Sequence, residues 1–323
     1  MWKRSSNTKN DKTLIFLGCI SLVILVVFLL IKNNLPDGRD VENEIAVQYM
    51  EEMIDAISVY CQENGISPDP VNDPLLSGLI GEEWTEITTT IGHLDAKQTT
   101  LNPDFASLMV DLLKEAGVES GDPIALGCSG SFPGLLLASL AGAKAMDLEC
   151  RSIISIGASS YGANRMAFSI LDIYQVLFRA GLLDAGPIAV SLGGEGDRAL
   201  EWESFIREEM IKKVETSGLP FIREGNLERS VEERMKLYGF QTESAPVIFV
   251  NAGGATANIG TSQSVLRMKP GVIRSASIPD VDQQGVIHKA LLNDIPVIHL
   301  LFIKGLVLEY GLPWDPVQAL DAE

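Results

Sequence analysis

The chain has 323 residues, of which 46% are hydrophobic, and its formal net charge is −18 because 43 acidic residues outnumber 25 lysines and arginines. This composition excludes a disordered chain, a collagen and a small disulfide scaffold, and the length is sufficient for a large hydrophobic core. The acidic balance also argues against a nucleic-acid partner, because binding to phosphates requires clustered lysine and arginine.

The positive charge gathers at the amino terminus, where residues 1–32 carry a net charge of +4. Residues 14–31 contain no charged side chain. As a helix this stretch would rise by about 27 Å, close to the ~30 Å hydrocarbon core of a bilayer. We therefore predict a basic tail over 1–12 and a transmembrane anchor over 13–32. No small-residue cleavage site follows, which favours an anchor over a cleaved signal peptide. The positive-inside tendency places the tail in the cytoplasm and the main domain outside the cell membrane.

We predict a linker and an amphipathic helix over 33–75, before an α/β domain over 76–323. Within 41–64, Ile45, Tyr49, Met53, Ile57 and Tyr60 recur every three or four residues, which is typical of a helix with one apolar face. We expect that face to pack on the main domain; a spacer that only holds the domain off the membrane is the alternative.

Beyond residue 104, short apolar runs alternate with helical patterns. This alternation predicts an α/β fold with a mainly parallel sheet flanked by helices. Residues 272–277 and 295–302 look like strands that complete the same domain. The predicted strands cover 123–126, 152–156, 188–191 and 246–250, and the predicted helices cover 105–116, 135–146, 171–180 and 198–217.

Each of the four predicted strands runs into a turn rich in glycine and serine. In a parallel sheet such turns lie along one edge, where α/β proteins bind their ligands. Glycine lets the backbone approach a ligand closely, and helix amino ends offer N–H groups to an anion. We predict an anion-binding crevice, although tight turns need small residues in any α/β protein. The candidate ligand-binding residues are Gly127, Gly130, Ser159, Ser160, Asn164, Gly194, Asp197, Asn251, Gly253 and Gly254.

Several well-known site chemistries are absent from the sequence. No glycine-rich turn carries the lysine of a P-loop, and Gly194-Glu195-Gly196 supplies only the first pair of a dinucleotide fingerprint. The histidines and cysteines have no ligand spacing, so we predict no metal and no cofactor. His288 or His299 could act as the base of a serine nucleophile, with His288 the better candidate, but we expect His299 in a core or strand position and His288 at the surface.

Neither 127–131 nor 157–162 matches the serine-hydrolase elbow, because the second glycine is displaced by one position in each, but both put serines at a strand-to-helix turn. Ser129 and Ser131 are therefore catalytic candidates, with Lys97 as their base, and Ser159 and Ser160 are further candidates. Lys97 lies in a threonine-rich segment, 82–104. We favour a solvated β-hairpin there over a loop that reaches across the crevice and offers Lys97 to an anion.

The stretches 78–118, 124–146 and 152–164, followed by SLGGEGD and VNAGGATANIG, resemble the poly-gamma-glutamate system protein family. The likeness spans roughly residues 75–265. It implies a bacterial membrane protein whose partners are the proteins of poly-gamma-glutamate synthesis and export, but it carries no catalytic residues with it.

Two functions remain open at this stage. The first is a membrane-anchored accessory component that binds an anionic ligand or a chain end in the crevice. The alternative is an extracytoplasmic serine-type hydrolase or transferase acting on gamma-glutamyl chains, with backbone N–H groups as its oxyanion hole.

Overall fold

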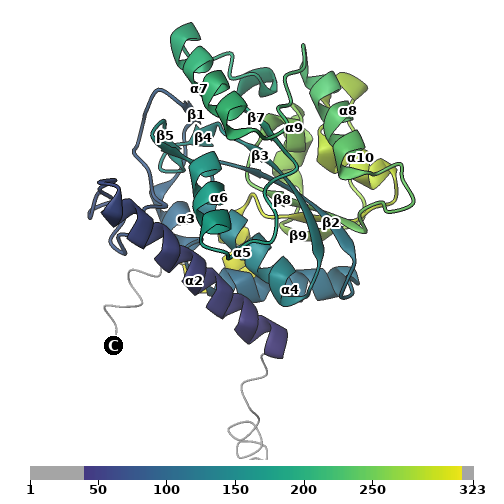
Figure 1. The fold of residues 1–323 in the computed structure, drawn as a ribbon. Coiled ribbons are helices and arrows are strands. Elements are labelled where there is room, and N and C mark those ends of the chain that lie inside the picture. Colours follow the sequence, from purple (N-terminus) through teal and green to yellow (C-terminus); the bar gives the residue numbers. More distant parts are fainter. Residues whose placement is uncertain (1–39, 315–323) are drawn as a thin grey trace, which may run out of the picture. The chain divides into compact units, whose positions relative to one another are not determined.

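A six-stranded sheet organises the protein in the computed structural model, which describes residues 40–314 (Figure 1). The strand order is β7-β3-β2-β8-β10-β9, and every neighbouring pair is parallel except β10 with β9. This confirms the predicted α/β class with a mainly parallel sheet flanked by helices. The strands are β2 (Pro123–Ser129), β3 (Glu149–Ser155), β7 (Ala189–Ser191), β8 (Ile248–Ala252), β9 (Gly271–Ile273) and β10 (Val297–His299).

The strand order reverses direction between β2 and β8. From β2 the chain builds β3 and then β7 on one side, and it returns to place β8 and β10 on the other. The loops that follow β2 and β8 therefore diverge. In open α/β sheets a ligand crevice forms at such a switch point, beyond the carboxyl ends of the strands.

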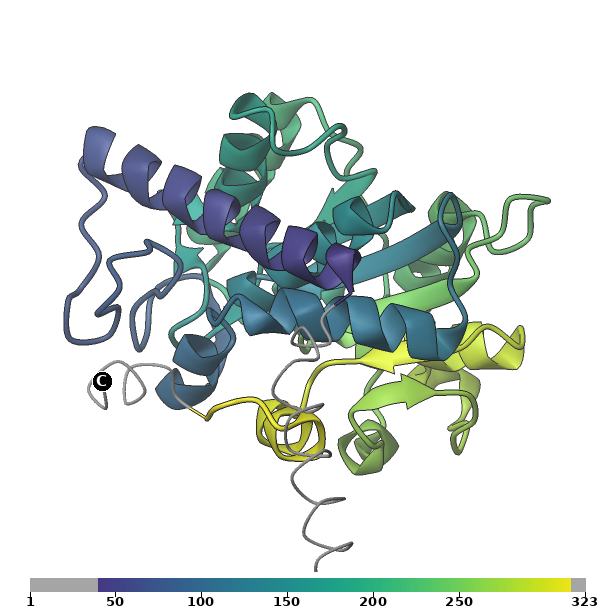
Figure 2. The same ribbon diagram turned by 90° about the horizontal axis from the view of Figure 1, so that it is seen from below.

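One face of the sheet is covered by α2 (Val41–Glu63), α4 (Asp104–Ala116), α5 (Pro133–Ala145) and α6 (Ile170–Arg179). Figure 2 shows α2 running across this face beside α4. Leu126, Ile154 and Val250 point into this core from neighbouring strands. α5 is buried over nearly its whole length because leucine, alanine and glycine occupy all of its sides. α7 (Ser204–Ser217) and α11 (Ile303–Tyr310) add side chains to the same core.

The opposite face carries a second core under α8 (Leu227–Tyr238), α9 (Thr256–Ile259) and α10 (Val286–Leu292). Ala125, Ile153 and Phe249 belong to it. They are the sequence neighbours of residues that face the first core, because side chains alternate along a strand. Burial on both faces explains why the strands read as continuous apolar runs.

The predicted helix over 41–64 is confirmed as α2, and it packs on the main domain as expected. From Val41 onward the chain forms one compact unit, so this helix belongs with the α/β domain. Its buried side is rotated slightly from the predicted one, since Met50 and Cys61 are fully buried whereas Ile45 is 38% exposed. Asn43 adds a polar contact to α4, with its amide nitrogen 2.8 Å from Asp111 Oδ1.

The hairpin predicted within 82–104 is wrong. Thr88–Thr90 forms β1, which pairs in parallel with β4 (Ala158–Ser159), and Leu94–Thr99 forms the short helix α3. A long-range strand pair therefore replaces the local one, and the segment lies against the loop that follows β3. That loop also contains the small antiparallel pair β5 (Asn164–Arg165) and β6 (Phe168–Ser169).

Other boundaries shift by a few residues. The helix predicted over 198–217 begins only at Ser204, because a 3-10 turn, η1 (Glu195–Asp197), and several residues with positive φ precede it. The expected strands near the carboxyl end are present as β9 and β10. Two further 3-10 turns are η2 (Gln263–Arg267) and η3 (Val281–Gln283).

The predicted tail over 1–12 and the predicted anchor over 13–32 lie outside the described residues. Within residues 40–314, no helix combines the length and the apolar character needed to cross a bilayer.

Candidate active site

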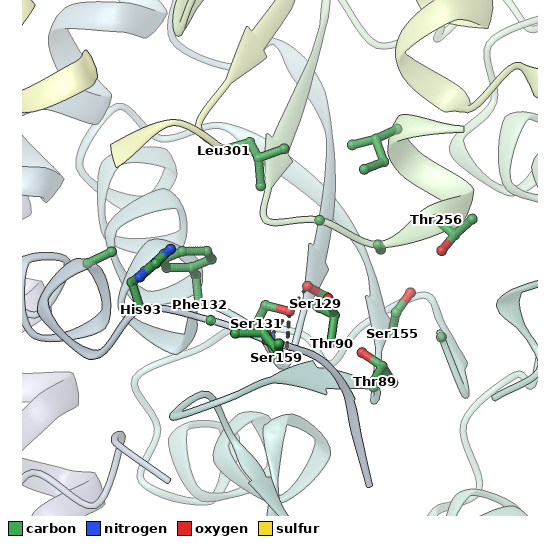
Figure 3. A pocket seen from close by; sticks show the side chains of 18 of the residues that line it. Thr89, Thr90, His93, Ser129, Ser131, Phe132, Ser155, Ser159, Thr256 and Leu301 are labelled. Atoms are coloured by element: carbon green, nitrogen blue, oxygen red, sulfur yellow. Dashed lines mark hydrogen bonds between the residues drawn. The ribbon is translucent and has the colours of Figure 1, made fainter. Parts of the chain in front are cut away.

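A crevice of about 990 Å³ opens beyond the carboxyl ends of the parallel strands. The loops after β2, β3, β7, β8 and β10 contribute to its lining, together with residues 89–97. Figure 3 shows Ser129, Ser131, Ser155 and Ser159 gathered at its base, with Leu301 across the opening. The turns predicted to share one sheet edge therefore do enclose a space.

Lys97 reaches the base of this crevice from α3. Its Nζ lies 2.7 Å from Ser159 Oγ, contacts the carbonyl oxygen of Ser131, and sits 3.4 Å from the centroid of the Phe132 ring. The side chain is almost fully enclosed, with 1% of the residue exposed. Among the described residues, no carboxylate forms an ion pair with it.

Burial without a carboxylate partner changes the protonation of this lysine. Desolvation lowers the pKa of the Lys97 ammonium from 10.5 to about 7. A substantial fraction of Lys97 is therefore neutral at physiological pH. A neutral amine 2.7 Å from a hydroxyl can accept its proton, which is the arrangement of a serine–lysine pair.

Close packing of α3 against α5 holds Lys97 in place. Thr100, the residue that follows α3, donates its hydroxyl proton to the Lys97 carbonyl over 2.8 Å. A Cβ added at Gly134 would lie 2.3 Å from the carbonyl oxygen of Thr100. Only glycine at that position lets the end of α3 approach the first turn of α5 so closely.

Ser159 is fixed by backbone contacts on two sides. As part of β4 it pairs with β1, and its backbone N–H donates to Ser131 Oγ over 3.0 Å. Ser131 thus serves as a support for Ser159, and Lys97 bonds to the carbonyl oxygen of Ser131 and not to its hydroxyl. Ser129 Oγ accepts a longer bond, 3.4 Å, from the backbone N–H of Ser131. Of the candidate serines, Ser159 is the one whose hydroxyl meets the lysine.

A second buried cation lies beneath the floor of the crevice. Arg234 of α8 and Asp197 of η1 form an ion pair at 2.8 Å, and both side chains are almost completely buried. The same guanidinium nitrogen, Nη2, lies 2.7 Å from Ser191 Oγ and 3.2 Å from Ser155 Oγ. Since Ser155 lines the crevice, this network fixes one of its polar groups.

The structure brings together six of the thirteen residues selected from the sequence. The crevice lining includes Lys97, Ser129, Ser131, Ser159, Gly194 and Gly254. The other selected residues are absent from that lining and lie within the protein around it. They are Gly127, Gly130, Ser160, Asn164, Asp197, Asn251 and Gly253.

These interior residues have structural partners. The Asn164 amide donates to the Glu82 carbonyl over 2.7 Å and so ties the loop after β3 to the segment before β1. A Cβ at Gly127 would meet the side chain of Asn258 at 2.6 Å. Gly253 has φ +114°, and a Cβ there would lie 2.8 Å from Ser129 Oγ, so glycine is required for the close approach of these two turns.

The positions predicted for His299 and His288 are confirmed in one case and wrong in the other. His299 lies buried in β10 as predicted, and burial lowers its pKa to about 4. The surface position predicted for His288 is wrong, because that residue is fully buried at the start of α10. Its Nδ1 accepts the backbone N–H of Gly285 over 3.0 Å, and burial lowers its pKa. Neither of these two imidazoles lines the crevice, whereas His93, directly before α3, does line it and lies beside Phe132 in Figure 3.

Sequence reasoning missed several lining residues, among them Phe132, Ser155 and Thr256. Ser155 is the last residue of β3 and Thr256 the first of α9, so their positions at element ends were the available signal. Across residues 40–314, no group of three or more histidine, cysteine, aspartate or glutamate side chains is arranged to hold a metal ion.

Comparison with known proteins adds no family assignment. No family model, curated protein or solved structure matches the chain. The functional argument therefore rests on the geometry of the crevice and on the residues that line it.

Proposed function

We propose that this crevice catalyses serine-type acyl transfer, with Ser159 as the nucleophile and Lys97 as the general base. The observation that carries the proposal is the 2.7 Å contact between Lys97 Nζ and Ser159 Oγ at the base of the crevice. The lowered pKa of Lys97, about 7, makes the neutral amine available. Of the two functions that the sequence leaves open, this is the serine-type hydrolase or transferase, with Ser159 as its nucleophile.

The chemistry would run in two steps. Neutral Lys97 accepts the proton of Ser159 Oγ as that oxygen attacks the carbonyl carbon of an ester or amide. The bond to the leaving group breaks, and the Lys97 ammonium returns its proton to that group. Water or another nucleophile then attacks the acyl-serine and releases the acyl group.

Ser131 and Phe132 lead into the amino end of α5. Pro133 has no N–H, and the Leu135 N–H donates to the Phe132 carbonyl over 3.1 Å. This leaves the Gly134 N–H of the first turn to stabilise the oxyanion.

The same geometry supports catalysis better than anion binding by Lys97. The Nζ atom is directed at Ser159 and Ser131 and covered by the Phe132 ring, and only 1% of the residue is exposed. An ammonium used to hold a carboxylate would have to release those partners first. It would also have to stay charged, which burial opposes.

The setting of this activity rests on the sequence. We propose a membrane-anchored component of a bacterial poly-gamma-glutamate synthesis or export system, with the helix over 13–32 in the membrane, the tail in the cytoplasm and the crevice on the outer side. The family resemblance and the uncharged segment 14–31 support this part of the proposal.

The direct test is covalent labelling of the full-length protein in detergent. A fluorophosphonate probe at about pH 8.5, where Lys97 would be mostly neutral, is expected to attach to Ser159, as read by peptide mass spectrometry. Ser159→Ala and Lys97→Met should abolish labelling, whereas Ser160→Ala, at a buried neighbouring serine without contact to Lys97, should retain it.

Failure to label Ser159 in a folded wild-type protein would overturn the proposal. Folding is checked by near-ultraviolet circular dichroism. If the wild-type protein instead binds a gamma-glutamate oligomer, and binds it more tightly below pH 7 than above, Lys97 acts as a charged clamp. The accessory, binding function would then hold.

A further inference from the structure

The crevice is lined by both hydroxyl and large apolar side chains. Figure 3 shows the four serines with Thr89 and Thr90 on one side, and Leu301 and Thr256 across from them. Besides Phe132 and Ile303, the large apolar side chains of the lining are Ile91, Ile259, Leu266, Leu301, Phe302 and Trp314. They come from the segments after β1, β8 and β10 and from the last described residue, so apolar side chains reach the crevice from distant parts of the chain.

Three of the apolar lining residues, which we call the rim residues, are largely exposed to solvent. Ile91 is 81% exposed, Leu266 is 72% exposed and Phe302 is 57% exposed. Single exposed apolar residues are common, but three around the mouth of one crevice form a surface that favours an apolar ligand.

The charges around the crevice oppose a polyanion. Asp95, Glu195 and Glu201 contribute to its lining. Lys304 is the exposed lysine among the lining residues, and its ammonium lies 5.8 Å from the centroid of the Trp314 ring. Lys97 is buried behind Ser159 and does not offset these carboxylates at the mouth. A polymer of carboxylates would therefore be repelled from the opening.

We infer that the substrate of this crevice is an ester or amide that carries an aliphatic chain, with the scissile carbonyl at Ser159 and the chain against Leu266, Leu301 and Phe302. This inference rests on the proposed function and names its substrate class. Within a poly-gamma-glutamate system it would direct the enzyme to a lipid-linked or acylated molecule instead of the body of the polymer.

Ester hydrolysis by the full-length protein tests this inference. For p-nitrophenyl esters from acetate to decanoate, kcat/KM is expected to rise by roughly two- to fourfold for each methylene that the apolar side chains of the lining bury. Leu266→Glu should flatten this series and reduce activity on the long esters about tenfold or more. The ratio of decanoate to acetate activity should therefore fall, because only a long acyl chain held at Ser159 would extend to Leu266, which is 72% exposed.

Leu308→Glu is the matched control. Leu308 is 75% exposed on α11 and does not line the crevice. Partition of the longer esters into detergent affects all three proteins equally, so ratios between variants remove it. If Leu266→Glu behaves like Leu308→Glu at every chain length, or if wild-type activity does not rise with chain length, the inference is wrong.

A binding measurement separates this inference from the proposed function. Ser159→Ala should still bind the long esters, detected by displacement of a fluorescent acyl probe, and Leu266→Glu should weaken that binding. If binding follows this pattern but wild-type protein neither hydrolyses the esters nor labels at Ser159, the catalytic proposal fails and the apolar site stands. If Ser159 labels but chain length has no effect on rate or binding, the proposed function stands and this inference fails.

Discussion

Two buried cations lie near the same edge of the sheet and have opposite environments. Arg234 is paired with Asp197 at 2.8 Å and also contacts Ser155 and Ser191. Lys97 contacts a hydroxyl, a carbonyl and an aromatic ring, with no ion-pair partner among residues 40–314. A buried ion pair holds packed elements together, whereas burial of an ammonium without a carboxylate partner lowers its pKa. The contrast supports a structural role for Arg234 and the chemical role that we propose for Lys97.

The largest expected effect is on catalysis at Lys97. Lys97→Met should reduce ester hydrolysis by about 10³-fold or more, because Ser159 would lose the group that accepts its proton. The variant should remain folded, since methionine fits the apolar surroundings of the lysine stem. Rates are measured on the full-length protein beside Ser160→Ala, and retention of most activity by Lys97→Met would remove the lysine from the mechanism.

The second effect is on stability at the paired cation. Asp197→Ala leaves Arg234 buried without its carboxylate, and we expect a loss of about 3–5 kcal/mol in the free energy of unfolding. Denaturant unfolding of the full-length protein measures it. Glu149→Ala, which removes an ion pair with a 61% exposed carboxylate, is the control and should cost at most ~1 kcal/mol. Equal losses in the two variants would contradict the structural role of Arg234.

The sequence predicts the fold around Arg234 and Lys97 but only part of the difference between their environments. The alternation of apolar runs and helices predicts the parallel sheet, and the glycine- and serine-rich turns predict its functional edge. Asp197 and Asn164 looked like turn residues available to a ligand, but each is occupied by a partner far along the chain, Arg234 and Glu82 respectively. Local patterns cannot show such pairing, because it depends on how distant elements pack.

Local sequence patterns also fail to predict the burial of Lys97. Its threonine-rich surroundings favour a solvated hairpin, and a lysine is usually exposed. Its burial follows from the parallel pairing of β1 with β4 and from the contact between Thr100 and Gly134. Both are long-range contacts, so the sequence predicts the candidate base and a set of serines that includes Ser159, but neither which serine contacts Lys97 nor the burial of the lysine.

A third prediction sharpens the contrast through pH. The pKa of Lys97 is about 7 in the folded protein and 10.5 when unperturbed, so between these values the unfolded state binds the additional proton. Stability of the wild-type protein relative to Lys97→Met should therefore rise with pH across this window, by at most about 1.4 kcal/mol per pH unit, and level off below pH 7. Titration of all other groups cancels in the difference. A flat difference would mean that Lys97 keeps its ordinary pKa and cannot act as a neutral base.

The smallest effect expected is at the packing that positions the lysine. In Gly134→Ala the new Cβ would lie 2.3 Å from the Thr100 carbonyl oxygen, so the end of α3 must move away from α5. We expect a loss of about 1–3 kcal/mol in stability. Ester hydrolysis should fall further than this modest loss of folded protein would explain, because Lys97 would no longer meet Ser159 at 2.7 Å. Gly225→Ala, where no atom lies within 4 Å of the added Cβ, is the control and should match wild type. Full activity in Gly134→Ala would show that the lysine–serine contact does not depend on the α3–α5 packing.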